Sequence, residues 1–290
     1  MSTVVRLGQF SASPVIAAIH HLGLDARHGL ELTTVRVPSS PEQFAMLRDD
    51  AIDVAITSPD NVLLYATTDR NPLAMRFDLT LLRPIDHGLG LSLVTRPEID
   101  SKDALATSSL GVDVVRSGFA LLLFTMLASF DVDFRTMEFA ELGSTPKRMT
   151  ALIEGRADGT ILNAESLVTA REAGMRVWCT SADVCADYLG TVLAVPTGFD
   201  ADLAGALTGV WQTATDWLLE APADDVTTCL AKVSTALGSP AYVELLRDPR
   251  FGLIRGDAVS LSSLETLVDI RARAGAYTPA PEDVARLARS

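Results

Sequence analysis

The feature that most constrains this chain is an internal repeat. Residues 37–61, VPSSPEQFAMLRDDAIDVAITSPDN, align without a gap over residues 142–166, LGSTPKRMTALIEGRADGTILNAES. Five positions are identical in the two copies: Ser39/Ser144, Pro41/Pro146, Leu47/Leu152, Asp53/Asp158 and Ile56/Ile161. Each copy has a Ser-Ser-Pro or Ser-Thr-Pro signal for the start of a helix, then an acidic residue and a short apolar run typical of a buried strand. The repeat predicts two lobes of the same design.

The segments upstream of the two copies follow the same order of elements. Residues 5–24 and 110–129 both read as a strand, a polar loop and an apolar helix. Alternating strands and helices predict an α/β fold in which each lobe has a parallel sheet with helices on both faces.

The chain should pass between the two lobes twice. Residues 86–99 would carry it into lobe two, and a strand within residues 188–199 would bring it back. The remainder, from about residue 200, has helical periodicity and is expected to pack mainly on lobe one. The predicted domains are residues 1–92 plus 195–290 for lobe one and residues 93–194 for lobe two.

The charge and the cysteines exclude several classes of function. The formal net charge is −13 and no Lys/Arg cluster occurs, which argues against nucleic acid or an anionic membrane surface as a partner. The cysteines Cys179, Cys185 and Cys229 form no Cys-x-x-Cys pair, so we predict free structural thiols and no metal site. No nucleotide-binding or hydrolase motif is present, and no cofactor is predicted.

The N-terminal residues of the sequence give an expectation for the cellular location of the protein. MSTVVRLGQFSASPV contains no apolar stretch of the length that a secretory signal requires, so the sequence as written predicts a cytoplasmic protein. A periplasmic or lipid-anchored protein is expected only if a leader has been removed. The most apolar segment, GFALLLFTMLASF, is too short to span a membrane, and no membrane insertion is predicted.

Over its whole length the chain resembles the type II periplasmic-binding-protein fold. Within that fold it is similar to the solute-binding proteins of nitrate, sulfonate and taurine import and to their thiamine-pyrimidine-synthase-like relatives. The resemblance is carried by GLELTTVRVPSSPEQFAMLRDDAIDVAITSPDN, RPEIDSKDAL before LGVD, GSTPKRMTALIEGRADGTILNAES, and YLGTVLAV before a helical tail. It implies a small-molecule ligand between two lobes that close like a Venus flytrap and, if the protein is exported, an ABC permease as partner.

The chain departs from that family in three respects. It has no export signal as written, and it lacks the Cys-rich segment of the synthases that bind pyridoxal phosphate, which argues against their activity. A sulfinate-removing relative has a nucleophilic Cys where Ser13 stands here. A serine would need a base within hydrogen-bond reach to replace that thiol.

Six loops that begin helices should converge between the lobes, because ligands of this type of fold bind beyond the carboxyl ends of the strands. Helix N-termini with Ser or Thr hydroxyls favour a carboxylate, sulfonate or phosphate, although such hydroxyls also cap helices that bind nothing. The predicted ligand-binding residues are Ser11, Ser13, Ser39, Thr57, Ser58, Asn61, His87, Arg116, Ser117, Gly118, Ser144, Asn163, Glu165 and Tyr188.

Some of these residues have competing interpretations. Arg116 could pair with a ligand carboxylate or remain a solvated surface residue. Asp60 and Glu165 occupy matched positions at helix starts, where a carboxylate complements the helix dipole; acid or base catalysis is the alternative. His87 is the best His candidate for the cleft, and Tyr188 could stack on a ligand ring.

Two functions follow from the sequence. The first is a solute-binding protein that captures a small anionic organic ligand by hinge closure and performs no chemistry. The alternative is a cytoplasmic, cofactor-independent enzyme of the same fold, such as a decarboxylase or another lyase, or an enzyme resembling those of pyrimidine biosynthesis.

Overall fold

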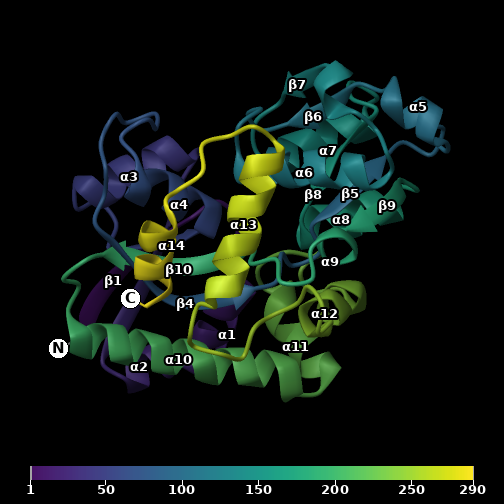
Figure 1. The fold of residues 1–290 in the computed structure, drawn as a ribbon. Coiled ribbons are helices and arrows are strands. Elements are labelled where there is room, and N and C mark those ends of the chain that lie inside the picture. Colours follow the sequence, from purple (N-terminus) through teal and green to yellow (C-terminus); the bar gives the residue numbers. More distant parts are fainter. Residues whose placement is uncertain (1, 290) are drawn as a thin grey trace.

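The computed structural model describes residues 2–289 and contains two sheets of five strands each (Figure 1). The first sheet has the order β2 (Leu30–Arg36), β1 (Thr3–Gln9), β3 (Val54–Thr57), β10 (Thr191–Pro196), β4 (Leu79–Asp86). The second has the order β7 (Phe139–Glu141), β6 (Leu110–Val112), β8 (Gly159–Leu162), β5 (Ser92–Thr95), β9 (Arg176–Thr180). The two sheets have equivalent topologies, so the repeat in the sequence is a repeat in space.

Each sheet is mixed rather than parallel, which corrects the prediction. β10 runs antiparallel to β3 and β4, and β5 runs antiparallel to β8 and β9. β4 ends at Asp86, and β10 begins beside it at Thr191. The chain passes through the second lobe and returns to the same end of the first sheet at which β4 leaves it, so β10 must run in the opposite direction to β4.

The helices of the repeat cover the sheets. In lobe one, the part built on the first sheet, they are α1 (Pro14–Leu22), α2 (Leu24–Arg27), α3 (Ser40–Arg48) and α4 (Pro59–Thr67). In lobe two, built on the second sheet, they are α5 (Lys102–Ala106), α6 (Gly118–Ser129), the 3-10 turn η1 (Phe134–Thr136), α7 (Thr145–Ile153), α8 (Ala164–Glu172) and α9 (Ser181–Val184).

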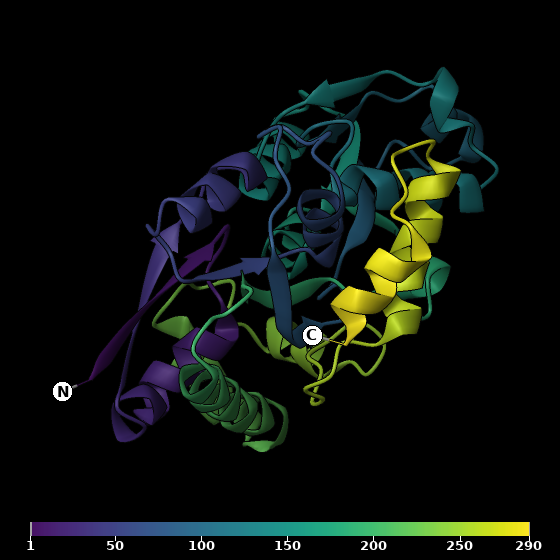
Figure 2. The same ribbon diagram turned by 60° about the vertical axis from the view of Figure 1, so that its left-hand side comes forward.

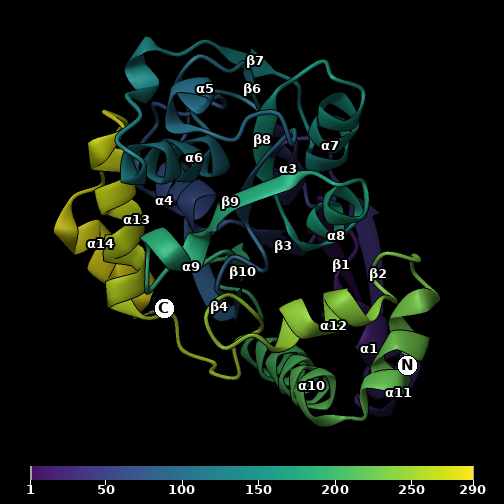
Figure 3. The same ribbon diagram turned by 90° about the vertical axis from the view of Figure 1, so that its right-hand side faces the viewer.

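The C-terminal helices contact both lobes. They are α10 (Ala201–Glu220), α11 (Ala223–Ala231), α12 (Pro240–Arg247), α13 (Leu261–Arg273) and α14 (Pro281–Ala288). α10 and α11 pack against α1, whereas α12 also packs against α8, and α13 packs against α6 (Figure 3). Figure 2 shows α10 and the pair α13–α14 on different sides of the first sheet. The predicted domain boundaries stay a prediction, because the C-terminal part connects the two lobes.

The repeated aspartate has the same structural role in each lobe. Asp53 accepts a hydrogen bond from the backbone N–H of Arg6 at 2.7 Å, and Asp158 accepts one from the N–H of Ser109 at 2.8 Å. In both lobes the aspartate N–H donates back to the carbonyl of the same residue. The carboxylate thus fixes the entry of β3 or β8 beside the first strand of its lobe.

A buried polar side chain on α3 and on α7 marks a second structural repeat. In lobe one the Gln43 amide donates to the carbonyls of Gly8 and Ile56. In lobe two the guanidinium of Arg148 donates to the carbonyl of Ile161, which aligns with Ile56, and to Thr160. Burial lowers the pKa of Arg148, against the opposing effect of the Asp113 charge.

Gln43 meets the same need without a charge, so Arg148→Gln should keep a donor for the Ile161 carbonyl but lose the bonds to the Gly143 carbonyl and the Thr145 hydroxyl. It is expected to lower the free energy of unfolding by about 1–3 kcal/mol, at about 0.5–1.5 kcal/mol for each lost bond. Arg148→Leu should cost more, because it leaves carbonyl groups without a donor. Urea unfolding followed by circular dichroism would compare the two variants. Equal losses for both would contradict a shared role with Gln43.

Both apolar cores cross from one lobe to the other. One cluster joins Phe44 of α3 to Leu127 of α6, and the other joins Leu7 of β1 to Leu167 of α8 and Trp211 of α10. The lobes are therefore packed against each other, and the space between them is small.

No helix within residues 2–289 is long and apolar enough to cross a membrane.

Candidate functional site

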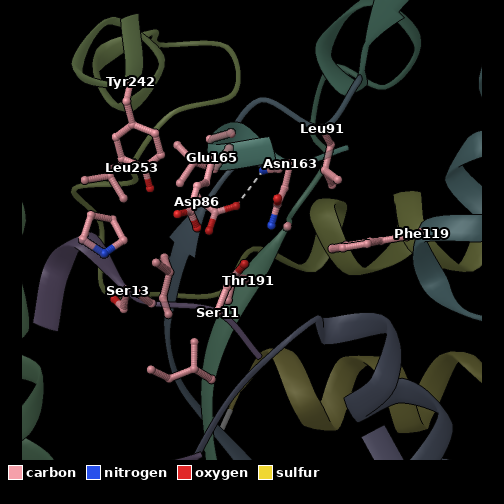
Figure 4. Close-up of a pocket in the computed structure, with 18 residues that line it drawn as sticks. Ser11, Ser13, Asp86, Leu91, Phe119, Asn163, Glu165, Thr191, Tyr242 and Leu253 are labelled. Carbon is pink, nitrogen blue, oxygen red and sulfur yellow. Dashed lines mark hydrogen bonds between the residues drawn. The ribbon is translucent and has the colours of Figure 1, made fainter. Parts of the chain in front are cut away.

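A cavity of about 100 Å³ lies between the lobes, where the two crossings of the chain meet (Figure 4). Its walls come from the β1–α1 loop, the β8–α8 loop, the two crossings, and single residues of β3, α6, α12 and the segment after α12. The lining residues are Ser11, Ala12, Ser13, Pro14, Ile56, Ile85, Asp86, Gly88, Leu89, Leu91, Phe119, Asn163, Ala164, Glu165, Gly190, Thr191, Tyr242 and Leu253. Pockets for drug-sized ligands have roughly 300–1,000 Å³, so this cavity suits a smaller molecule.

Asp86 is the buried acid of the cavity. It ends β4 at the edge where the chain leaves lobe one, and only 5% of its surface is exposed. The N–H of Gly88 donates to its carboxylate at 2.8 Å. Desolvation raises the pKa of Asp86 to about 6, against the opposing effect of hydrogen bonds from Thr191 and Gly88. A carboxyl with this pKa changes its charge close to neutral pH.

Two glycines allow the crossings to approach each other around Asp86. A Cβ atom on Gly190 would overlap the Asp86 carboxylate and the backbone of Gly88. Gly88 itself has a φ of +95°, which other residues adopt with strain. Glycine at these two positions lets both crossings lie in contact and places the Asp86 carboxylate at the cavity wall.

Glu165 is the second acid of the cavity. It lies in the first turn of α8, where a carboxylate complements the positive end of the helix dipole. Its Oε1 accepts a hydrogen bond from the Ser234 hydroxyl at 2.9 Å. Ser234 follows α11, so a C-terminal segment orients this acid of lobe two.

Tyr242 of α12 adds a polar group to the same wall. Only 3% of its surface is exposed, and its hydroxyl has no hydrogen-bond partner among the residues that the structure describes. Figure 4 shows the hydroxyl pointing toward the side of the cavity that holds Asp86 and Glu165. Burial raises the pKa of Tyr242, and the charges of Glu165 and Asp86 raise it further. The phenol therefore stays protonated beside two acids.

Asp60, which the sequence matches with Glu165, has a different environment. Both oxygens of its carboxylate lie 2.8 Å from the Nη1 atom of Arg271 on α13, and the two side chains are 5% and 3% exposed. Burial raises the pKa of Asp60, and the Arg271 guanidinium opposes that rise. Gly118 at the start of α6 lies against Asp60, since a Cβ atom there would be 2.9 Å from the Asp60 Cβ. Asp60 is a structural ion-pair partner at the contact between the lobes.

The structure brings four of the predicted residues to the cavity and leaves the others outside its lining. The four are Ser11, Ser13, Asn163 and Glu165. Their binding of a ligand stays a prediction. The predicted residues outside the lining are Ser39, Thr57, Ser58, Asn61, His87, Arg116, Ser117, Gly118, Ser144 and Tyr188.

Helix capping accounts for several of the residues outside. The hydroxyls of Ser39, Ser58 and Ser117 accept hydrogen bonds from the first turns of α3, α4 and α6. Thr57 is buried and accepts from the Asn61 amide at 3.1 Å. These side chains form hydrogen bonds at the starts of α3, α4 and α6, the alternative that the sequence left open. Ser144 begins α7 without a side-chain cap bond.

The side chains of Arg116, His87 and Tyr188 also lie outside the cavity lining. Arg116 is exposed and makes no hydrogen bond or ion pair with any residue from 2 to 289. The Nδ1 atom of His87 lies 3.2 Å from the carbonyl of Tyr188. Tyr188 is fully buried beside Gly88, and its hydroxyl has no partner in the described chain. Stacking of Tyr188 on a ligand would require the packing around Gly88 to open.

Sequence reasoning missed Asp86, Thr191, Tyr242 and Phe119 as cavity residues. A signal existed for Asp86, because it precedes His87 at the predicted exit from lobe one. Tyr242 had no such signal, since the approach of α12 to the cavity depends on packing against α8 and α10. Among the described residues, no group of three or more His, Cys, Asp or Glu side chains could hold a metal ion.

No family model and no curated protein sequence matches this chain, whereas solved structures match it over almost its whole length. The alkanesulfonate-binding protein SsuA of Xanthomonas axonopodis pv. citri, bound to MOPS, has a TM-score of 0.76 and 17% identity, with 99% of this chain and 98% of that chain covered. The periplasmic aliphatic sulphonate binding protein SsuA of Escherichia coli has a TM-score of 0.69 and 16% identity, with 96% and 92% covered.

A third solved structure is the ligand-binding component of an ABC-type import system from Staphylococcus aureus, with zinc bound. It has a TM-score of 0.73 and 13% identity, and the match covers 100% of both chains. Identities this low show the fold alone. The two equivalent sheets, the double crossing and these likenesses together show that the chain has the two-lobed α/β fold of the type II periplasmic binding proteins.

Proposed function

We propose that this protein is a solute-binding protein that holds one small molecule between its lobes and performs no chemistry on it. The observation that carries the proposal is the position of the cavity at the meeting point of both crossings, where closure of the lobes would surround a ligand. The similar solved structures are named as binding proteins. None of those names supports the enzyme that the sequence left as an alternative.

The same reasoning extends to partner and location. One similar structure is named as a component of an ABC-type import system and another as periplasmic. A solute-binding protein of this kind would deliver its ligand to an ABC permease outside the cytoplasm. The cytoplasmic location predicted from the sequence gains no support from these likenesses, and the proposal takes the periplasmic alternative.

The anionic ligand predicted from the sequence has mixed support from the cavity. The loops that begin α1 and α8 line it, and helix N-termini favour anions. Asp86 and Glu165 line it too, and within the described part of the chain no Arg, Lys or His does. The fixed charge of the site is therefore negative.

The test of binding is a thermal-shift screen against small metabolites, with mass spectrometry to detect conversion. Ala12→Trp would fill the cavity from its exposed rim and should abolish stabilisation by any hit. Ala201→Trp, at the exposed start of α10, is the matched control and should leave the stabilisation unchanged. Conversion of the bound compound, or equal stabilisation of the Ala12→Trp variant, would contradict the proposal.

A further inference from the structure

Resting on the proposed solute-binding function, we propose that the ligand is a small organic cation, whose ammonium or guanidinium group lies between the carboxylates of Asp86 and Glu165. The class differs from the sulfonates named for the similar structures. The proposal rests on the hydrogen bonds that the two acids accept and on the absence of a cationic partner for either acid in the described chain.

Neither acid of the cavity has a cationic partner in the described chain. Asp86 accepts hydrogen bonds from the Gly88 N–H, and Glu165 accepts one from the Ser234 hydroxyl, but no ion pair includes either residue. Asp60, equally buried, is held by Arg271. Glu165 is partly exposed, but Asp86 is buried, and buried carboxylates are normally paired because an isolated charge in a low-dielectric site is costly. A cation supplied by the ligand would complete the cavity as Arg271 completes the site of Asp60.

The Tyr242 hydroxyl supports a ligand with N–H donors. It lies on the wall that holds both acids, has no hydrogen-bond partner among residues 2–289, and can accept a hydrogen bond (Figure 4). The side chain of Asn163 also lines the cavity and makes no hydrogen bond with another described residue. An ammonium or guanidinium group offers several donors, and the two carboxylates, the phenol and the amide oxygen are acceptors for them.

The apolar residues of the lining indicate the chemistry of the uncharged part of the ligand. Phe119, Leu91, Leu253 and Ile56 supply apolar walls. In Figure 4, Phe119 and Leu91 lie on the side away from Tyr242. A short alkyl chain would contact these walls while the charged end meets the acids. The structure thus favours a small alkylammonium or alkylguanidinium compound over a neutral or anionic one.

A matched series of probes tests the charge of the ligand directly. n-Butylammonium, 1-butanol and butanesulfonate share one alkyl chain and differ in their polar end. n-Butylammonium is expected to raise the melting temperature and to bind in calorimetry, whereas the other two should bind at least tenfold more weakly. Asp86→Asn should weaken n-butylammonium binding by about ten- to a hundredfold, the effect of removing a hydrogen bond to a charged group.

Glu244→Gln is the control, because it removes one negative charge from the exposed side of the helix that carries Tyr242. It should leave n-butylammonium affinity within twofold. Tighter binding of butanesulfonate than of n-butylammonium would overturn the inference and leave the solute-binding function intact. Equal effects of Asp86→Asn and Glu244→Gln would also overturn it. Failure of all three probes and of the wider metabolite screen would count against the solute-binding function itself.

Discussion

Arg271→Met is expected to lower the free energy of unfolding by about 3–5 kcal/mol, because it leaves Asp60 as an uncompensated charge in a buried site. Arg271 also donates from Nε to the carbonyl of Tyr277 at 2.6 Å, and that carbonyl would lose its donor. Methionine preserves the apolar stem of the arginine side chain, so loss of packing should contribute less than loss of the charge. Urea unfolding at neutral pH, followed by circular dichroism, would measure the difference.

The position of the ion pair explains why its loss should affect both lobes. Asp60 belongs to α4 of lobe one, Arg271 to α13, and Gly118 of α6 in lobe two lies against the Asp60 side chain. A carboxylate that lost its partner would draw water into this contact, and α13 would lose its link to α4.

Two further variants separate the charge effect from general damage to α13. Arg273→Met makes the same substitution at an exposed position of the same helix and should cost less than about 0.5 kcal/mol. Asp60→Asn combined with Arg271→Met removes both charges and should recover part of the loss. If the double variant is as unstable as the sum of the two single variants, the pair is not coupled as the structure indicates.

The contrast between Asp60 and Glu165 shows where prediction from the sequence succeeded and where it stopped. The repeat placed both acids at the start of equivalent helices, and both lie there. Their partners, Arg271 and Ser234, come from the C-terminal part of the chain, which has no counterpart in the repeat. The sequence therefore treated the two carboxylates alike, although one is held in an ion pair and the other lines the cavity.

The fold and the rest of the cavity likewise contain features that the repeat predicts and features that it does not. Two equivalent lobes and two crossings could be predicted, because Asp53 and Asp158 repeat in the sequence, and each accepts a hydrogen bond from a backbone N–H at the same place in its lobe. The reversed strands β5 and β10 could not, since a short apolar run carries no information about its direction in a sheet. Tyr242 reaches the cavity only through the packing of α12 between α8 and α10.

Asp86→Asn is expected to stabilise the ligand-free protein at pH 7 by up to about 3 kcal/mol. The pKa of Asp86 is about 6 in the folded protein, against an ordinary value of 3.8. Between these two values the folded state keeps a proton that the unfolded state has lost, so the stability contributed by this group falls as the pH rises from about 4 to 6. Above pH 6 the ionised Asp86 lowers the free energy of unfolding by a constant amount. That amount is about 1.4 kcal/mol for each unit by which its pKa in the folded protein exceeds the ordinary value.

The groups around Asp86 do not change the sign of this effect. Glu165 and Tyr242 share the cavity wall, and the nearby His87 favours the charged form of Asp86, but desolvation is the largest effect. Burial also raises the pKa of Asp60, but Asp60 is present in both proteins, and the difference between them isolates Asp86.

Urea unfolding at a series of pH values from 3 to 8 would measure the stability gained by Asp86→Asn. The gain should be close to zero at the lowest pH and should reach its full value above pH 6, while Glu244→Gln should show no such change. A residue whose removal stabilises the empty protein and weakens the bound ligand is kept for binding, because function at a site commonly costs stability. A loss of stability at pH 7 would instead make Asp86 a structural acid of the crossing.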